Sequence, residues 1–94
     1  MVSTRTTPYQ AMIALLKKAR IQKKLSQRAV AKLCGKSQSY VTQYERCETR
    51  LDIIDYYGLA RLLDVTDEQI IKTLHRYYDE HPIDKILNDQ KKTN

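Results

Sequence analysis

The apolar residues between Leu25 and Glu45 recur at helical spacing on either side of one glycine. Ser26 is a favourable N-cap for a first short helix. Gly35 predicts the end of that helix, because glycine enters the left-handed conformation of a C′ position at little cost. The apolar side of this helix is expected to comprise Ala29, Val30, Leu33 and Cys34.

A second short helix is predicted directly afterwards, with Ser37 as its N-cap. Val41 and Tyr44 share its inner side. Two helices joined by so short a turn cannot lie antiparallel, so they are expected to cross at a steep angle. This pattern is typical of a helix-turn-helix, whose second helix enters the major groove of DNA. The polar residues on the outer side are Gln38, Ser39, Thr42 and Gln43.

This stretch resembles the Xre or Cro/CI-type helix-turn-helix family of phage and bacterial repressors. The resemblance covers about residues 16–65, and it implies a lambda-repressor-like fold and DNA binding. It is carried by Ser26-Gln27, Ala31, Gly35, Ser37-Gln38-Ser39, Tyr40-Val41, Glu45-Arg46 and Arg50-Leu51-Asp52. Members often have glycine where this chain has Lys24 and Cys47. Both positions follow helix ends, so this chain is expected to close those helices by other means.

The flanking segments predict further helices. Thr7, Pro8 and Gln10 form a helix start with a capping box, and this helix is expected to reach about Lys24. Its inner side comprises Met12, Ile13, Leu16 and Ala19. Asp52 is expected to cap a fourth helix, the most buried of the set, because it has too many apolar residues for one stripe. These are Ile53, Ile54, Tyr57, Leu59, Ala60, Leu62 and Leu63.

A fifth helix is predicted from the capping box Thr66–Gln69 to about Glu80. Its apolar face comprises Ile70, Ile71, Leu74, Tyr77 and Tyr78. Pro82 ends this helix or starts a sixth, which would carry Ile83, Ile86 and Leu87. The expected fold is therefore an all-α bundle of five or six helices. It divides into an arm (1–6), a helix-turn-helix domain (7–65), a helical extension (66–87) and a polar tail (88–94).

The apolar face of the extension has two interpretations. It is large for a chain of this size, and soluble monomers seldom expose such a patch, so we expect part of it to meet a second copy in a homodimer. The alternative is that the segment folds back on the first and fourth helices of its own chain.

Charge is unevenly distributed along the chain. Residues 1–50 carry 11 Lys or Arg against 2 acids, a net charge of +9, whereas residues 51–94 carry 6 against 9, a net charge of −3. Such asymmetry favours one face that meets a polyanion, although an ordinary solvated surface is the alternative. Because the basic half contains the helix-turn-helix, double-stranded DNA is the expected partner.

Other functional classes receive little support. Two cysteines are too few for a secreted disulfide scaffold, and Cys34 is expected to be a small buried residue. His75 and His81 lack a third ligand at metal spacing, and no catalytic triad or phosphate loop is present in the sequence. No enzyme activity, metal or cofactor is therefore predicted. A cytoplasmic protein is expected, because neither a membrane-length apolar run nor a signal peptide is found.

Residues on the outer side of the second helix of the motif are the candidates for base contacts: Gln38, Ser39, Thr42 and Gln43. A Gln amide can bond adenine N6 and N7 together, whereas the alternative for each residue is a polar side chain that faces water. Phosphate contacts are expected from Arg20, Gln27, Lys36, Ser37, Tyr40, Arg46 and Arg50.

The family resemblance also implies an ion pair between Arg20 and Glu45, with a solvated Arg20 as the alternative. The predicted function is a transcriptional regulator, most simply a repressor on a palindromic operator. One alternative is the antitoxin of a toxin–antitoxin pair, in which the fifth helix covers a protein toxin. A protein-binding adaptor that binds no DNA is a weaker one.

Overall fold

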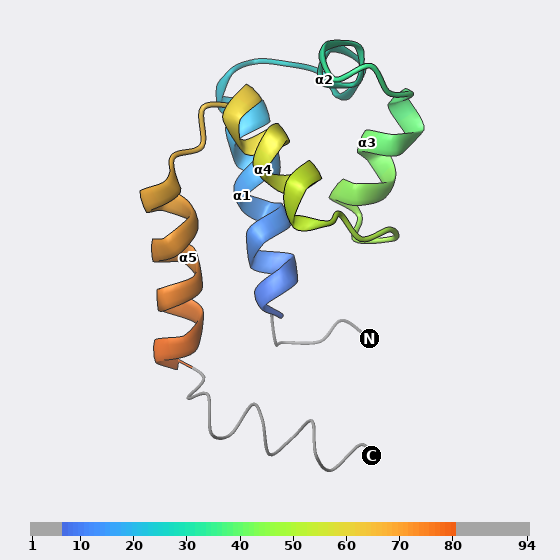
Figure 1. Cartoon of the computed structure of the whole chain (residues 1–94). Helices are drawn as coiled ribbons and strands as arrows, with labels where there is room; N and C mark the ends of the chain where they lie inside the picture. The colour runs from blue at the N-terminus through green and yellow to red at the C-terminus, as the bar shows by residue number, and fades with distance from the viewer. Residues whose placement is uncertain (1–6, 81–94) are drawn as a thin grey trace.

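The computed structural model describes residues 7–80, which form five helices and, within that range, no strand. The helices are α1 (Pro8–Gln22), α2 (Gln27–Leu33), α3 (Gln38–Glu45), α4 (Ile53–Leu62) and α5 (Asp67–Glu80). In Figure 1, α5 lies on one side of α1, whereas α2 and α3 lie on the other. The all-α fold predicted from the sequence is confirmed.

Every N-terminal cap predicted from the sequence is formed. Thr7 accepts a bond from the Gln10 amide and donates its own amide to the Gln10 side chain, each at 3.0 Å. These side-chain oxygens satisfy amides that the helix itself leaves without a partner. The other caps are Ser26, Ser37, Asp52 and Thr66.

Four helices end at a residue with left-handed backbone geometry. Gly35 (φ 70°) is the one predicted, but Lys24 (φ 59°), Cys47 (φ 60°) and Asp64 (φ 61°) adopt the same conformation. In each case the amides of this residue and the next bond back to the last turn, as in a Schellman motif. The expectation that Lys24 and Cys47 close their helices by other means is therefore wrong. They use the glycine conformation despite having a Cβ atom, which is a strained arrangement.

The core lies between the first four helices and the turn that follows α4. Its buried residues are Ile13, Leu16, Val30, Ala31, Val41, Tyr44, Tyr56, Leu59, Ala60, Leu63 and Val65. Helix α5 adds only the partly buried Ile70 at the edge of this cluster. The helix-turn-helix therefore belongs to a unit whose core is complete without α5.

Several apolar residues are less buried than the periodicity predicts. Leu33 and Tyr57 are exposed, and Ile53 and Ile54 are 80% and 76% exposed. Ile53 lies two turns before the fully buried Ala60 on nearly the same side of α4, so its exposure means that the first turn of α4 extends beyond the core. Helix α4 was predicted to be the most buried of the set, but only its later turns, with Tyr56, Leu59 and Ala60, are buried. Cys34, expected to be a small buried residue, is half-buried.

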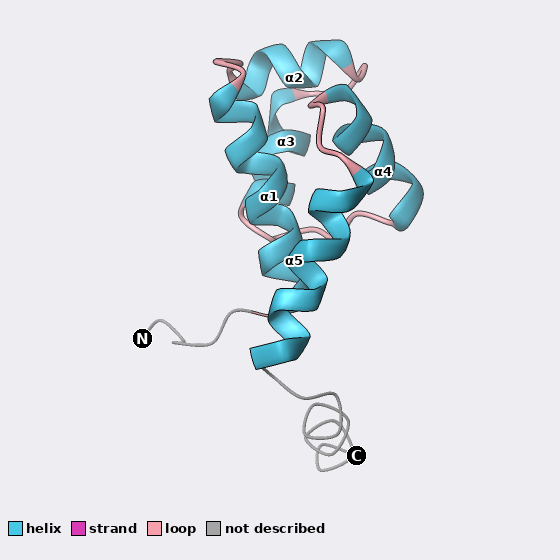
Figure 2. Cartoon of the chain, turned by 90° about the vertical axis from the view of Figure 1, so that its left-hand side faces the viewer, coloured by secondary structure: helices cyan, strands magenta, loops and turns pink. Residues whose placement is uncertain are grey.

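Helix α5 lies along α1 (Figures 1 and 2). Leu74, Tyr77 and Tyr78 are half-buried there, whereas Ile71 remains exposed. The described part of the extension therefore folds back on its own chain, as the alternative interpretation expected. It packs along α1, and its Asp67 accepts a hydrogen bond of 2.9 Å from the Tyr57 hydroxyl on α4. The homodimer stays a prediction. The predicted arm (1–6), the apolar residues after Pro82 and the polar tail lie outside the described residues.

Candidate nucleic-acid interface

The turn between α2 and α3 is closed by backbone bonds around Gly35. Its amide donates to the Lys32 carbonyl at 3.3 Å, and the Lys36 amide donates to the Ala31 carbonyl at 2.8 Å. A Cβ atom at Gly35 would meet nothing within 4 Å, so glycine is favoured there by its φ angle and not by lack of space. Ser37 then caps α3, which fixes the start of that helix only three residues after Cys34, the C-cap of α2.

Helix α3 has the two sides that the sequence predicts. Val41 and Tyr44 are fully buried, and they hold the helix against the core. Gln38, Ser39 and Gln43 point outward and are exposed. The two glutamine amides make no side-chain hydrogen bond with any residue that the structure describes, so their donors and acceptors are available to a partner.

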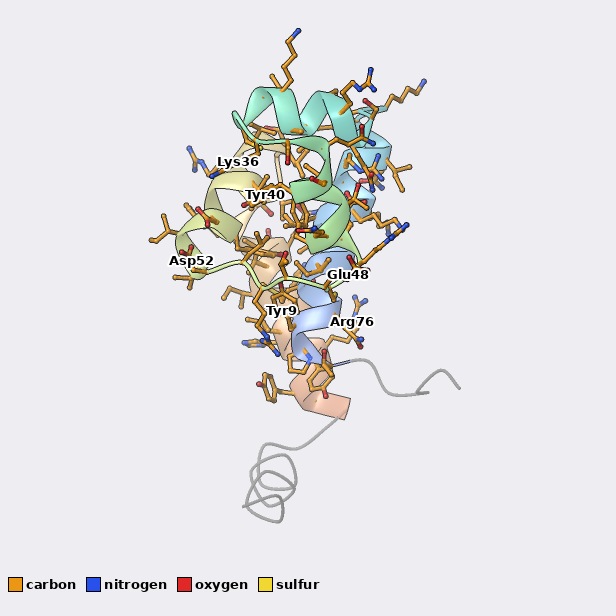
Figure 3. All side chains as sticks on the ribbon, turned by 90° about the vertical axis from the view of Figure 1, so that its right-hand side faces the viewer. Tyr9, Lys36, Tyr40, Glu48, Asp52 and Arg76 are labelled. Atoms are coloured by element: carbon orange, nitrogen blue, oxygen red, sulfur yellow. The ribbon has the colours of Figure 1, made fainter. Side chains whose placement is uncertain are left out.

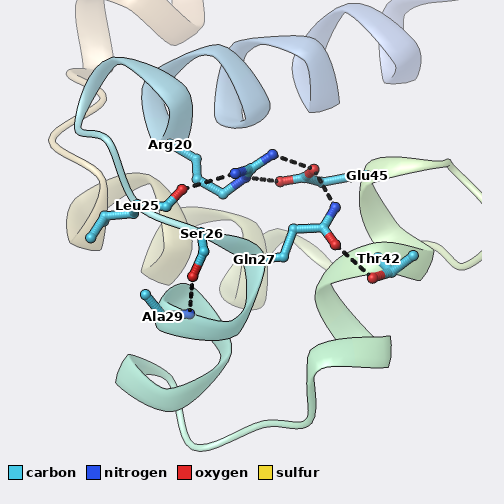
Figure 4. Close-up of polar contacts among 7 residues, drawn as sticks. All are labelled: Arg20, Leu25, Ser26, Gln27, Ala29, Thr42 and Glu45. Atoms are coloured by element: carbon cyan, nitrogen blue, oxygen red, sulfur yellow. Dashed lines mark hydrogen bonds and ion pairs between the residues drawn. The ribbon is translucent and has the colours of Figure 1, made fainter.

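A buried polar network joins α1, α2 and α3 (Figure 4). Arg20 binds Glu45 through two bonds, Nε to Oε2 at 2.6 Å and Nη2 to Oε1 at 3.1 Å, and Nη1 donates to the Leu25 carbonyl at 2.8 Å. The side chains of Arg20 and Glu45 are 12% and 2% exposed. The predicted ion pair is therefore present, and it is a buried two-point contact whose geometry fixes the end of α3.

Gln27 extends this network across to the outer part of α3. Its Nε2 donates to Glu45 Oε1 at 2.9 Å, and its Oε1 accepts from Thr42 Oγ1 at 2.8 Å. The network changes two predicted roles. Arg20 is buried with three nitrogens engaged inside the protein, so the phosphate contact expected of it gives way to a positioning role. Within the part of the chain that the structure describes, Gln27 retains one N–H that no acceptor uses, and Thr42 retains its oxygen lone pairs.

The candidate base-reading residues gather at one place. Gln38, Ser39, Thr42 and Gln43 line a shallow hollow on the outer side of α3 together with Arg46 and Glu48. Ser39 Oγ lies 3.1 Å from Ser37 Oγ, so this hydroxyl also has an internal neighbour. Glu48 was not singled out from the sequence, and its carboxylate lies 3.9 Å from Arg46 Nη1. It is an acid at the edge of a surface that is otherwise polar or basic.

Lys36 and Tyr40 lie together at the start of α3 (Figure 3). The Lys36 ammonium lies 5.3 Å from the centre of the Tyr40 ring, within range of a cation–π contact. Tyr40 packs edge-on against Tyr44 with ring centres 5.7 Å apart. Partial burial raises the pKa of the Tyr40 hydroxyl, and the carboxylate of Asp55 adds to that rise. Tyr40 therefore stays protonated and keeps a hydrogen to donate.

Arg50 is held by Tyr9, a residue that the sequence analysis did not single out. The Arg50 guanidinium lies 4.7 Å from the centre of the Tyr9 ring. The Tyr9 hydroxyl donates to the Thr49 carbonyl at 3.2 Å and accepts from the Leu51 amide at 3.0 Å. Tyr9 therefore ties the loop after α3 to the start of α1. Its spacing of three, four and seven residues from Met12, Ile13 and Leu16 could have placed it on the inner side of α1.

Tyr44 packs α3 against the core, as the sequence indicates. It is fully buried, and burial raises the pKa of its hydroxyl. Within the described residues, this hydroxyl is the one buried side-chain polar atom without a hydrogen-bond partner. Its ring therefore contributes packing, whereas its hydroxyl adds a desolvation cost to the core.

Two further kinds of feature are absent from residues 7–80. No group of three or more His, Cys, Asp or Glu residues in this part of the chain is arranged to hold a metal ion. No helix of the described chain has the length and apolar character needed to cross a membrane.

Comparison with known proteins agrees with this geometry. The helix-turn-helix family matches residues 16–70, more than half of the chain. No curated protein and no solved structure matches the chain. The matched range includes the buried Arg20–Glu45 pair, the turn at Gly35 and the whole of α3. The chain therefore belongs to the Xre or Cro/CI-type family of helix-turn-helix DNA-binding regulators.

Proposed function

We propose that this protein is a transcriptional repressor that binds a palindromic operator as a homodimer through α3. The observation that carries the proposal is the contrast between the two sides of α3. The buried Arg20–Glu45 pair and Tyr44 hold its inner side in one orientation. Its outer side presents the amides of Gln38 and Gln43 with no internal partner among the described residues.

Gln38 is the proposed principal base reader. It is the first residue of α3, and the N-terminal residues of a recognition helix point at base edges in the major groove. A free amide there can donate to adenine N7 and accept from adenine N6. Gln43 lies five residues further along α3 and lines the same hollow, as does Ser39, and it is the second proposed reader.

Phosphate contacts are proposed at both ends of α3. Lys36 and Tyr40 stand at its start, and Arg46 and Arg50 follow its end, all with polar groups available at the surface. Ser37 and the unused N–H of Gln27 complete this set. These contacts would fix the register of the protein on the duplex and supply affinity that depends on salt.

A homodimer is proposed because one small domain contacts few base pairs. Two copies related by a two-fold axis would place their α3 helices about 34 Å apart, one turn of B-DNA. The exposure of Ile71 favours α5 as part of the contact between the two copies, since this residue is exposed on a helix that otherwise packs on α1.

The antitoxin alternative needs an apolar face on α5 that is free to cover a toxin. Leu74, Tyr77 and Tyr78 are half-buried on the protein itself, which leaves less of that face for a toxin and equally for a second copy. We rank a DNA-binding repressor first because DNA reading by the exposed outer side of α3 does not require that face.

In vitro selection of DNA from a random pool tests the proposal. A consensus with two inverted half-sites is expected. Gln38→Ala should then cost about 1–3 kcal/mol on the selected site and relax the choice at one base pair per half-site. Arg50→Ala is the matched control, because loss of a phosphate contact should weaken binding to all sequences alike and lower the salt slope by about one. Equal losses on selected and random DNA for Gln38→Ala would remove it as a base reader.

Sedimentation equilibrium of the full chain tests the homodimer. A monomer at tens of micromolar, both free and on DNA with two half-sites, would refute it. If the chain dimerises, Ile71→Lys should weaken the dimer without loss of helix content, and Ile53→Lys is the matched control at an exposed isoleucine on a different helix.

A further inference from the structure

The hydrogen bonds at the junction of α1, α2 and α3 have one possible direction. Arginine only donates hydrogen bonds, and a carboxylate only accepts them. Arg20 gives two bonds to Glu45, so both oxygens of that carboxylate are acceptors. The next member, Gln27, must therefore present its NH₂ group to Glu45, which it does at 2.9 Å.

This constraint also determines the other end of the Gln27 amide. A rotation that exchanged its oxygen and nitrogen would bring two acceptor oxygens together at Glu45, so the amide has one satisfactory orientation. Its Oε1 consequently faces Thr42 Oγ1 at 2.8 Å. Because Oε1 can only accept, the hydrogen of this bond belongs to the Thr42 hydroxyl.

A hydroxyl has one hydrogen and two lone pairs. Thr42 uses its hydrogen on Gln27, so what it offers outward is acceptor capacity alone. The side chain is half-buried and lines the hollow between Gln38, Ser39 and Gln43 on the outer side of α3. Gln38 and Gln43 differ from it, since neither amide is bonded within residues 7–80, so each keeps both donors and an acceptor and can pair with any base edge.

We propose that Thr42 is a specificity-determining position that accepts a hydrogen bond from an exocyclic amine in the major groove, adenine N6 or cytosine N4. These amines are the donors that base edges present there, whereas guanine O6 and thymine O4 are acceptors and would face a second acceptor at Thr42. Gln27 is then a positioning residue that sets this preference without a base contact. The inference rests on the proposed function, since it assumes that the outer side of α3 reads DNA.

The test compares the DNA selected by the full-length wild-type chain with that selected by three variants. The wild-type chain should select adenine or cytosine at one position per half-site. Thr42→Val, which keeps the shape and removes the hydroxyl, should lose the preference there and retain the flanking consensus. Thr42→Ser, which keeps the hydroxyl and removes the methyl group, should retain it. Gln27→Leu should broaden the position to guanine and thymine, because the Thr42 hydrogen becomes free to donate.

A base analogue supplies a direct measurement. At the position concerned, purine in place of adenine, or 2-pyrimidinone in place of cytosine, removes only the amine. The wild-type chain should lose roughly 3- to 10-fold in affinity, as expected for one hydrogen bond, and Thr42→Val should lose none. Melting temperatures and helix content of all three variants show whether the fold is kept.

Four results would overturn the inference. The first is an unchanged consensus for Thr42→Val, and the second is a wild-type preference for guanine or thymine at the position that Thr42→Val alters. The third is loss of the preference in Thr42→Ser. The fourth is a Gln27→Leu variant that folds but does not broaden the preference. Loss in Thr42→Ser together with a thymine preference would assign the contact to the methyl group. Failure to select any consensus would instead refute the proposed function itself, so the two failures are distinguishable.

Discussion

The junction of α1, α2 and α3 and the first turn of α4 depart from ordinary burial in opposite directions. The junction buries an arginine and a glutamate, and the turn exposes Ile53 and Ile54 to solvent. Both lie in the same small domain and close to α3 in the sequence or in space. A burial rule that assigns charges to the surface and isoleucines to the core fails at each of them.

The difference shows how each arrangement depends on its neighbours. Buried charges are stable at the junction because Arg20, Glu45 and Gln27 satisfy one another, so the arrangement depends on every member. The isoleucines at the start of α4 do not contribute to the core, so the fold depends little on either of them. The same kind of truncation should therefore be severe in one region and nearly silent in the other.

The largest effect is expected from Glu45→Ala. It leaves the Arg20 charge buried without its partner, which costs about 3–5 kcal/mol of unfolding free energy. Urea denaturation measures the loss. Glu48→Ala is the matched control, because its exposed contact with Arg46 at 3.9 Å should contribute less than about 0.5 kcal/mol. Similar losses in the two variants would mean that burial of the ion pair does not matter.

The same truncation at two isoleucines tests the other side of the comparison. Ile13 is 2% exposed and Ile53 is 80% exposed. Ile13→Ala should cost about 2–5 kcal/mol, because it removes buried methyl groups and leaves a cavity. Ile53→Ala should change stability by less than about 0.5 kcal/mol. A loss above about 1.5 kcal/mol for Ile53→Ala would show that the first turn of α4 is covered in solution.

Alkaline titration examines the buried hydroxyls near the same core. Burial raises the pKa of Tyr56 from its ordinary value of 10.0 to about 12, and it also raises that of Tyr44. Above pH 10 the unfolded chain releases these protons before the folded chain does, so stability should fall as pH rises. At pH 11 the raised pKa of Tyr56 should lower the free energy of unfolding by about 1.4 kcal/mol relative to its value below pH 10.

Urea denaturation at pH 9 and pH 11 measures this loss, and Tyr56→Phe should show a smaller difference between the two pH values. That variant also loses the 2.8 Å bond from the Tyr56 hydroxyl to the Met12 carbonyl, so the comparison uses the change with pH and not the absolute stability. An equal change with pH in both proteins would exclude Tyr56 as a cause.

The smallest effect is expected at the turn that leads into the polar junction. Lys24 has the left-handed geometry that favours glycine (φ 59°) and an exposed side chain. Lys24→Gly should raise the free energy of unfolding by about 1 kcal/mol, because it removes the clash of the Cβ atom. Lys24→Ala keeps that atom and should give no such gain. Thermal unfolding compares the two, and an equal gain would point to the loss of the lysine charge.

Most of the fold could be predicted from the sequence, because the residues that start and end the helices act locally. Capping residues such as Ser26, Ser37 and Asp52 bond to amides three residues away, and the turn at Gly35 needs only its own backbone geometry. Helical periodicity likewise placed Val41 and Tyr44 on the inner side of α3. Such features are determined within one or two helical turns, so no knowledge of distant residues is required.

The candidate site could be predicted from the sequence only in part. The outward positions of Gln38, Ser39 and Gln43 follow from the helical period, and the Arg20–Glu45 pair followed from the family resemblance. The support that Tyr9 gives to Arg50 joins residues 41 positions apart, and no local pattern indicates which ring will meet which guanidinium.

The sequence by itself determined where the helices begin, which side of α3 faces inward and which family the chain belongs to, because each depends on residue types at short spacing. Only the tertiary structure decided that the first turn of α4 extends beyond the core, since exposure depends on which helices end nearby. It also decided the state of the polar side chains. Gln27 and Thr42 are hydrogen-bonded to each other, while the Gln38 amide has no side-chain partner among residues 7–80, because the partners of a polar group are set by atoms that folding brings within about 3 Å.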